Sequence, residues 1–265
     1  MLFLHGFPEF WAAWRKPMAH FAARGWQCVA PDLRGYNLSD KPVGVDAYKA
    51  KYLMADVLAL GAHYSKTKFV LVAHDWGGAV AWAVAIGHAD RLQRLVMINS
   101  PHPYLFWREL ANNPAQQKAS EYMNVFRLAK AERVLSENGY ARLLGALGHL
   151  EEAWRAELVQ AWSQPGALTG GLNYYRASPL YPATVDDPGA KKLRFEAKDF
   201  MVRVPTLVLW GERDTALLTG CIDGLGDFVP DLKVVRAPDA SHWIVHEKPE
   251  LVCSEMEKFV GEGHG

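Results

Sequence analysis

The sequence predicts an α/β protein whose core is a mostly parallel, doubly wound sheet with an inserted helical cap. At both ends of the chain, short apolar runs typical of buried strands alternate with helical stretches. This alternation is typical of a parallel sheet covered by helices. Between residues 101 and 200 there is no convincing strand pattern, and the chain reads as several helices. We therefore expect a core formed by residues 1–100 and 201–265, and a cap formed by residues 101–200.

Each expected strand is an apolar run bounded by turn residues, and each expected helix has helical spacing of its apolar residues. Gly25 is placed to end the first helix, and Pro31 to close the second strand. The expected strands are residues 1–4, 26–30, 68–73, 92–99, 204–210 and 232–237. The expected core helices are residues 11–23, 48–65, 79–89 and 249–260.

Composition excludes several classes of partner. The 265 residues are 50% hydrophobic and carry no net charge, with 29 basic and 29 acidic side chains. This balance argues against nucleic acid or an anionic membrane surface as a partner. No apolar run is long enough to span a membrane, and no secretory signal is visible. The three cysteines, Cys28, Cys221 and Cys253, are widely spaced and odd in number, which favours a reducing cytoplasm.

The most informative motif is His74-Asp75-Trp76-Gly77-Gly78, which follows an apolar run and precedes an Ala/Val-rich helical stretch. A strand, a sharp glycine-bounded turn and a helix form a nucleophile elbow, in which the residue at the turn is usually serine. Here it is Asp75. A carboxylate with an ordinary pKa of about 3.9 is already an anion at neutral pH. It suits displacement at a saturated carbon, such as an epoxide or carbon–halogen carbon, and leaves an ester on the protein.

Two further residues complete a catalytic set in the expected chain order of nucleophile, acid and histidine. Asp214 and His242 each follow an expected strand, at the edge where open α/β sheets bind ligands. A histidine held by a carboxylate would activate the water that hydrolyses the aspartyl ester. His246 lies four residues after His242, as metal ligands on a helix do. Because no glutamate follows His242 and its catalytic role already accounts for it, we expect no metal.

The segment His5-Gly6-Phe7-Pro8 predicts an oxyanion site. Glycine allows the loop after the first strand to approach Asp75 closely. The backbone N–H groups of Phe7 and Trp76 would then face the carbonyl oxygen of the Asp75 ester.

These motifs together resemble the epoxide hydrolase branch of the α/β-hydrolases, a family close to the haloalkane dehalogenases. The resemblance implies an α/β-hydrolase fold and a small apolar epoxide and water as substrates, without a cofactor. It also implies cap tyrosines that donate hydrogen bonds to the epoxide oxygen. The matching stretches are His5–Glu9, Pro31–Asp40, His74–Gly78, Gly211–Asp214 and His242-Trp243.

The segment Asn173-Tyr174-Tyr175-Arg176 matches the Asn-aromatic-Tyr-Arg motif of that family and places Tyr175 on its tyrosine. Tyr122 is the candidate for the second tyrosine. A phenol, with an ordinary pKa near 10, would protonate the alkoxide that ring opening creates. Phe7, Trp76 and Trp243 are the candidate side chains for contact with the substrate.

Three alternatives remain open. A haloalkane dehalogenase would use Trp76 as a halide donor, but Phe7 stands where its second donor, an asparagine, often occurs. A haloacetate dehalogenase would carry an arginine where this chain has Trp76. A member of a different class, a non-catalytic receptor of the same fold, would bind a small molecule without turnover.

Relatives of this family usually carry two strands before the His-Gly-Phe-Pro strand, and this chain begins at that strand. We therefore expect the N-terminal edge strands to be missing. Residues 26–30 would then form a sheet edge open to pairing, for example in a homodimer.

Overall fold

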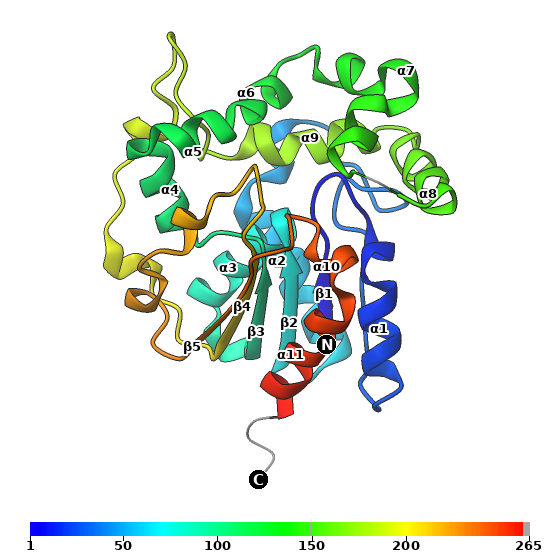
Figure 1. Ribbon diagram of the computed structural model, residues 1–265, viewed down its shortest axis with the longest axis vertical. Coiled ribbons are helices and arrows are strands. Elements are labelled where there is room, and N and C mark those ends of the chain that lie inside the picture. The colour runs from blue at the N-terminus through cyan, green and yellow to red at the C-terminus, as the bar shows by residue number, and fades with distance from the viewer. Residues whose placement is uncertain (149, 262–265) are drawn as a thin grey trace.

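The computed structural model describes residues 1–148 and 150–261. Its centre is a parallel sheet of five strands in the spatial order β1-β2-β3-β4-β5 (Figure 1). Each neighbouring pair runs parallel, which confirms the predicted sheet. The strands are β1 (Leu2–Leu4), β2 (Phe69–His74), β3 (Leu92–Ile98), β4 (Thr206–Gly211) and β5 (Leu232–Ala237).

Helices cover both faces of the sheet, because alternate residues of each strand point to opposite sides. In β2, Leu71 and Ala73 pack into the cluster that includes α2 and α3. Val70 and Val72 pack into a second cluster, with side chains of α1 and α11. The sheet is therefore doubly wound. The elements of this part of the chain are η1 (Trp11–Trp14), α1 (Arg15–Ala22), η2 (Val45–Tyr48), α2 (Ala50–Tyr64), α3 (Asp75–Gly87), η3 (Ala89–Arg91), η6 (Thr219–Ile222), η7 (Leu225–Asp227), α10 (Ile244–Glu247) and α11 (Pro249–Gly261).

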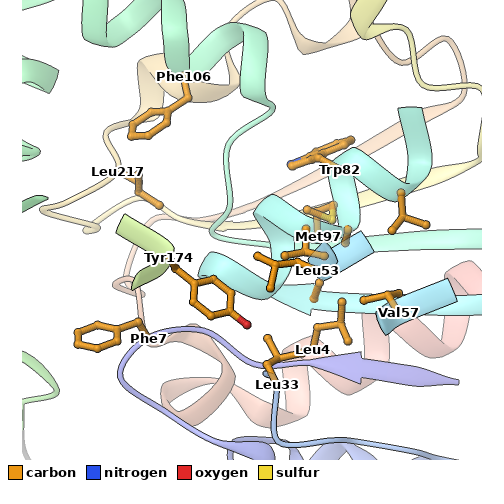
Figure 2. Close-up of a cluster of buried hydrophobic side chains, with 14 of the residues drawn as sticks. Leu4, Phe7, Leu33, Leu53, Val57, Trp82, Met97, Phe106, Tyr174 and Leu217 are labelled. Carbon is orange, nitrogen blue, oxygen red and sulfur yellow. The ribbon is translucent and has the colours of Figure 1, made fainter. Parts of the chain in front are cut away.

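The stretch between β3 and β4 is helical and lies over the carboxyl ends of the strands (Figure 1). Within the described parts of residues 101–200 there is no strand, as the sequence predicts. Figure 2 shows Phe106 and Tyr174 from this stretch in one apolar cluster with Phe7 and Leu33 of the sheet layer. The elements are α4 (Pro103–Asn112), α5 (Pro114–Ala119), α6 (Glu121–Arg127), α7 (Ala131–Ala146), α8 (Glu152–Trp162), α9 (Ala167–Ala177), η4 (Gly189–Lys192) and η5 (Ala197–Phe200).

The expected strand at residues 26–30 is wrong. This segment forms a single parallel bridge, between Val29 and Leu2. Two backbone hydrogen bonds support it, from the N–H of Phe3 to Val29 (2.8 Å) and from the N–H of Val29 to Met1 (3.0 Å). Pairing extends no further because β1 is only three residues long and Pro31 has no N–H to donate. Across residues 1–148 and 150–261, the sheet continues beyond β1 only as this bridge.

Helix α3 begins four residues before the expected start at Ala79. The sequence pattern places a turn at residues 75–78, but the turn is confined to Asp75, the first residue of the helix. Among the described residues, no helix is both long and apolar enough to cross a membrane.

Candidate active site

Asp75 occupies a sharp corner between β2 and α3. Its φ is +49°, in the left-handed region that non-glycine residues seldom adopt. Gly77 and Gly78 allow the first turn of α3 to pack directly against Leu4 and Ser100. A Cβ on Gly77 would lie 2.4 Å from the carbonyl oxygen of Leu4, and one on Gly78 would lie 2.3 Å from Cβ of Ser100. The sequence Asp-Trp-Gly-Gly therefore turns the chain within one residue and leaves the carboxylate at the carboxyl edge of the sheet.

The Asp75 carboxylate lies against the loop after β1. The backbone N–H of Phe7 donates to Oδ1 of Asp75 at 2.7 Å. A Cβ on Gly6 would lie 2.4 Å from that oxygen, so glycine is needed for the approach. Burial raises the pKa of Asp75 above its usual value, and the charge of His242 and the N–H groups of Trp76 and Phe7 offset part of this rise. The two backbone donors and the imidazolium thus favour the ionised carboxylate that burial disfavours.

His242 connects the two carboxylates. Its Nδ1 hydrogen-bonds to Oδ2 of Asp214 at 2.6 Å, and its Nε2 lies 3.6 Å from Oδ2 of Asp75. Burial lowers the pKa of His242, but the carboxylates of Asp214 and Asp75 more than offset this and raise it to about 9. Because the Nδ1 side is fixed by Asp214, Nε2 is the nitrogen available for proton transfer beside Asp75.

Asp214 is buried next to His242 and takes part in four hydrogen bonds. Its Oδ1 accepts the backbone N–H groups of Ala216 (2.8 Å) and Leu217 (2.9 Å), and its Oδ2 accepts Nδ2 of Asn99 (2.9 Å) as well as the histidine. Burial raises the pKa of Asp214, but the charge and hydrogen bond of His242 and the donated N–H groups lower it below its usual value overall. Asp214 is therefore held as a carboxylate that orients the imidazole.

Asn99 is a site residue that the sequence patterns do not identify. It follows β3 with a φ of +37° and is fully buried. It donates to Asp214 through Nδ2, and its Oδ1 accepts the backbone N–H of Gly211 at 2.8 Å. It thus connects the end of β3 to the loop that carries the acid. An asparagine at a strand end is a weak signal, because asparagine is common wherever the chain turns.

The two candidate tyrosines lie above Asp75 in the helical stretch. Tyr175 of α9 stacks edge-on against Trp76, with ring centroids 4.9 Å apart, and its ring lies 6.2 Å from that of Tyr122 of α6. Burial, the first cause in each case, raises the pKa of both phenols well above the usual value. Both side chains therefore remain protonated donors at neutral pH.

A cavity of about 380 Å³ opens between the sheet layer and the helices above it. Asp75, Trp76, Tyr122 and Tyr175 line it together, and the rest of its wall is mainly apolar. Along α3, the wall includes Ala79, Ala83 and Gly87. At 1.5 Å per residue, this face of the helix extends about 18 Å from the nucleophile.

Two expected substrate contacts lie elsewhere. The ring of Phe7 is not in the cavity wall and packs edge-on against Tyr175 at 5.4 Å, so Phe7 contributes its N–H rather than its side chain. Trp243 also lies outside the wall, next to His242, and its indole N–H donates to the carbonyl of Ala146 at 2.9 Å. The geometry supports a packing role for Trp243.

Glu9 is a buried acid that is connected to His242 through His74. Glu9, 1% exposed, hydrogen-bonds to Nε2 of His246 and lies 3.8 Å from Nδ1 of His74. Nε2 of His74 contacts the backbone carbonyl of His242 at 2.9 Å. Burial lowers the pKa of His74 to about 3, so this ring is neutral. His246 is thus directed to Glu9, and it does not pair with His242 as a metal ligand would.

Comparisons with known proteins place this geometry in a family. Residues 1–249 match the family model described as alpha/beta hydrolase fold. The AB hydrolase superfamily protein YfhM of Bacillus subtilis (strain 168) is 36% identical over 95% of this chain and 86% of its own length. Epoxide hydrolase 2 of Caenorhabditis elegans is 33% identical over 99% of this chain and 74% of its own.

A crystal structure of Bacillus megaterium epoxide hydrolase in complex with an inhibitor superimposes with a TM-score of 0.90. It is 32% identical and covers 99% of this chain and 93% of its own. The nucleophile elbow, the acid–histidine pair and these relatives agree with the predicted fold and resemblance. The chain belongs to the α/β-hydrolase fold family, in its epoxide hydrolase branch.

Proposed function

We propose that this protein hydrolyses epoxides to vicinal diols through a covalent ester on Asp75. The observation that carries the proposal is the placement of an aspartate at the elbow, between two backbone N–H donors and a histidine, beneath two protonated tyrosines. The epoxide hydrolases among its relatives support the same reaction.

Oδ2 of Asp75 is the attacking atom in this proposal, because Oδ1 is occupied by the N–H of Phe7. A new bond forms between Oδ2 and a ring carbon, and the carbon–oxygen bond of the epoxide breaks. Tyr175, assisted by Tyr122, gives its phenolic proton to the leaving oxygen. The products are a neutral aspartyl ester and a tyrosinate that regains its proton from solvent.

Hydrolysis of the ester follows at the same edge of the sheet. Nε2 of His242 takes a proton from water, and the hydroxide formed attacks Cγ of Asp75. The N–H groups of Phe7 and Trp76 stabilise the charge that develops on Oδ1. The Cγ–Oδ2 bond then breaks, and the departing diol oxygen takes the proton from His242. Asp75, left as a carboxylic acid, releases one proton to solvent, which balances the proton taken up by the tyrosinate and restores the carboxylate.

The substrate is a small apolar epoxide, since the wall of the cavity is mainly apolar apart from the reacting groups. The face of α3 from Ala79 to Gly87 leaves room for an extended apolar substituent. Location in a reducing cytoplasm, supported by free Cys28, Cys221 and Cys253, and self-association through the edge at residues 26–30 stay predictions. Light scattering tests the self-association.

Styrene oxide tests the mechanism. Asp75→Asn is expected to abolish diol formation, and His242→Gln to accumulate a covalent adduct on Asp75, visible as an added mass on the intact protein. Asp90→Asn, an exposed aspartate on η3, is the matched control and should turn over normally. Unchanged diol formation by Asp75→Asn would sink the mechanism.

A panel of haloalkanes in the same assay separates the remaining alternatives. Halide release in excess of diol formation would indicate a dehalogenase. Binding of styrene oxide with neither adduct nor diol would indicate a receptor.

A further inference from the structure

Arg127, the last residue of α6, reaches the carboxyl end of α9. Its Nη1 donates to the carbonyl oxygens of Tyr175, Arg176 (3.3 Å) and Ser178 (3.1 Å). The last carbonyls of a helix have no partner within the helix and carry partial negative charge. One guanidinium nitrogen therefore caps the helix that carries the proposed proton donor.

The sequence explains why α9 needs a donor from elsewhere. The carbonyl of Tyr175 would normally accept the N–H of the residue four positions later, which is Pro179. Proline has no N–H. The N–H of Leu180 is likewise directed to Oγ of Ser178, at 3.1 Å, and not to the carbonyl of Arg176. Arg127 supplies the hydrogen-bond donor that Pro179 and Leu180 do not provide for these two carbonyls.

The same arginine connects the two tyrosine-bearing helices. Tyr122 lies five residues before it on α6. Between them, the ring of Phe126 packs against both Tyr122 (5.3 Å between centroids) and Tyr175 (5.0 Å). A shift of the Arg127 contact would therefore change the position of Tyr175 relative to Tyr122.

The guanidinium is itself fixed. It lies over the ring of Tyr181, 3.7 Å from the centroid, and that ring is buried. The hydroxyl of Tyr181 donates to Asp187 at 2.8 Å and accepts from Lys192 at 2.9 Å. Arg127 is thus held in place on an ordered platform, unlike an arginine that extends freely into solvent.

The neighbouring Arg176 does not duplicate this role. Its guanidinium binds Glu132 through two nitrogens, at 2.7 and 2.8 Å, and donates to the carbonyl of Leu128 at 3.1 Å. These contacts attach α9 to the start of α7 and to Leu128, the residue that follows α6. The carbonyls at the end of α9 are left to Arg127.

We propose that Arg127 is a positioning residue for epoxide ring opening, which fixes Tyr175 over the leaving oxygen by capping α9. The inference rests on the proposed function. Because a misplacement of about 1 Å can cost about 10²-fold in rate, loss of this cap should slow ester formation strongly. It should leave the acid, the histidine and the ester hydrolysis that they carry out unaffected.

A double-mutant cycle on ester formation tests this. In the His242→Gln background, the rate of adduct formation with styrene oxide is followed by intact mass for Arg127→Met, Tyr175→Phe and the double variant. We expect Arg127→Met to slow adduct formation about 10- to 100-fold when Tyr175 is present. In the Tyr175→Phe background it should cause a much smaller further loss, since residues that act through one another are not additive.

Arg127→Lys keeps the charge but lacks the planar fork, and should recover part of the rate. If thermal unfolding shows that Arg127→Met does not fold, Arg127→Lys replaces it in the double-mutant cycle. Arg155→Met, at an exposed arginine of α8, is the matched control and should leave the rate unchanged. Additive losses in the cycle, or a normal rate in Arg127→Met, would overturn the inference. If His242→Gln with no other change forms no adduct and the unaltered protein forms no diol, the proposed function fails instead.

Discussion

Nε2 of His242 lies 3.6 Å from Oδ2 of Asp75. This distance places the base beside the carboxylate whose negative charge is lost when the proposed ester forms. While Asp75 is a carboxylate, it contributes to the raised pKa of His242, about 9, after the larger contribution of Asp214. Conversion of Asp75 to a neutral ester removes that contribution. Ester formation therefore lowers the pKa of the imidazole and makes it a base when the water must be activated.

Asp75→Asn imitates the neutral ester and should lower the pKa of His242 below about 9. The cause is the loss of a negative charge next to Nε2, while the bond to Asp214 remains. NMR titration of the imidazole protons measures the shift, with Asp90→Asn as the control. An unchanged pKa in Asp75→Asn would show that the two groups are not coupled.

The raised pKa of His242 also makes the stability depend on pH. Its value of about 9 in the folded protein exceeds the value of about 6.5 expected in the unfolded chain. The stabilisation is therefore fully present below about pH 6.5 and is lost as the pH rises through about 9. Urea unfolding of the unaltered protein and of His242→Gln should give free energies of unfolding whose difference becomes smaller, or reverses, over that range. A difference that does not change with pH would contradict the assigned pKa.

Gly6→Ala should abolish activity. The added methyl group would lie 2.3 Å from Cβ and 2.4 Å from Oδ1 of Asp75, so either the nucleophile or the loop with the Phe7 N–H must move. Gly145→Ala on α7 has no neighbour within 4 Å of the new methyl group and is the control. Diol formation and adduct formation are both measured. Normal rates in Gly6→Ala would mean that the loop does not need its close approach to Asp75.

Asn99→Ala should destabilise the protein by about 1–3 kcal/mol, because the N–H of Gly211 is left buried without a partner. It also removes a donor from Asp214, which raises the pKa of that carboxyl and weakens its hold on His242. We expect slower ester hydrolysis and therefore more adduct at steady state. Urea unfolding and intact mass give the two results, and a stable variant with normal hydrolysis would argue against a role for Asn99.

Local sequence patterns predict much of this architecture, because apolar runs and turn residues determine strands, turns and helices through contacts between neighbouring residues. The strand–turn–helix around Asp75 and the strand ends before Asp214 and His242 follow from apolar runs and glycines. The structure brings these three residues together, with Phe7, Trp76 and both tyrosines nearby.

Long-range contacts were not predictable in the same way. Glu9 and His246 are 237 positions apart, and no local pattern links them. The sequence also does not show that the short β1 limits pairing of residues 26–30, or that the indole of Trp243 is directed to a backbone carbonyl.

The tyrosines and the ester chemistry belong to different parts of the chain: Tyr122 and Tyr175 lie on the inserted helices, and Asp75, Asp214 and His242 lie at the sheet edge. In the proposed mechanism, ring opening thus needs groups from both parts, Asp75 and the tyrosines, whereas hydrolysis of the ester needs only the sheet edge. Exchange of the inserted helices for those of a relative would change which epoxides enter the reaction, while the sheet edge would complete it by the same route. The fold thereby allows substrate range to diversify while the second half of the chemistry is inherited unchanged.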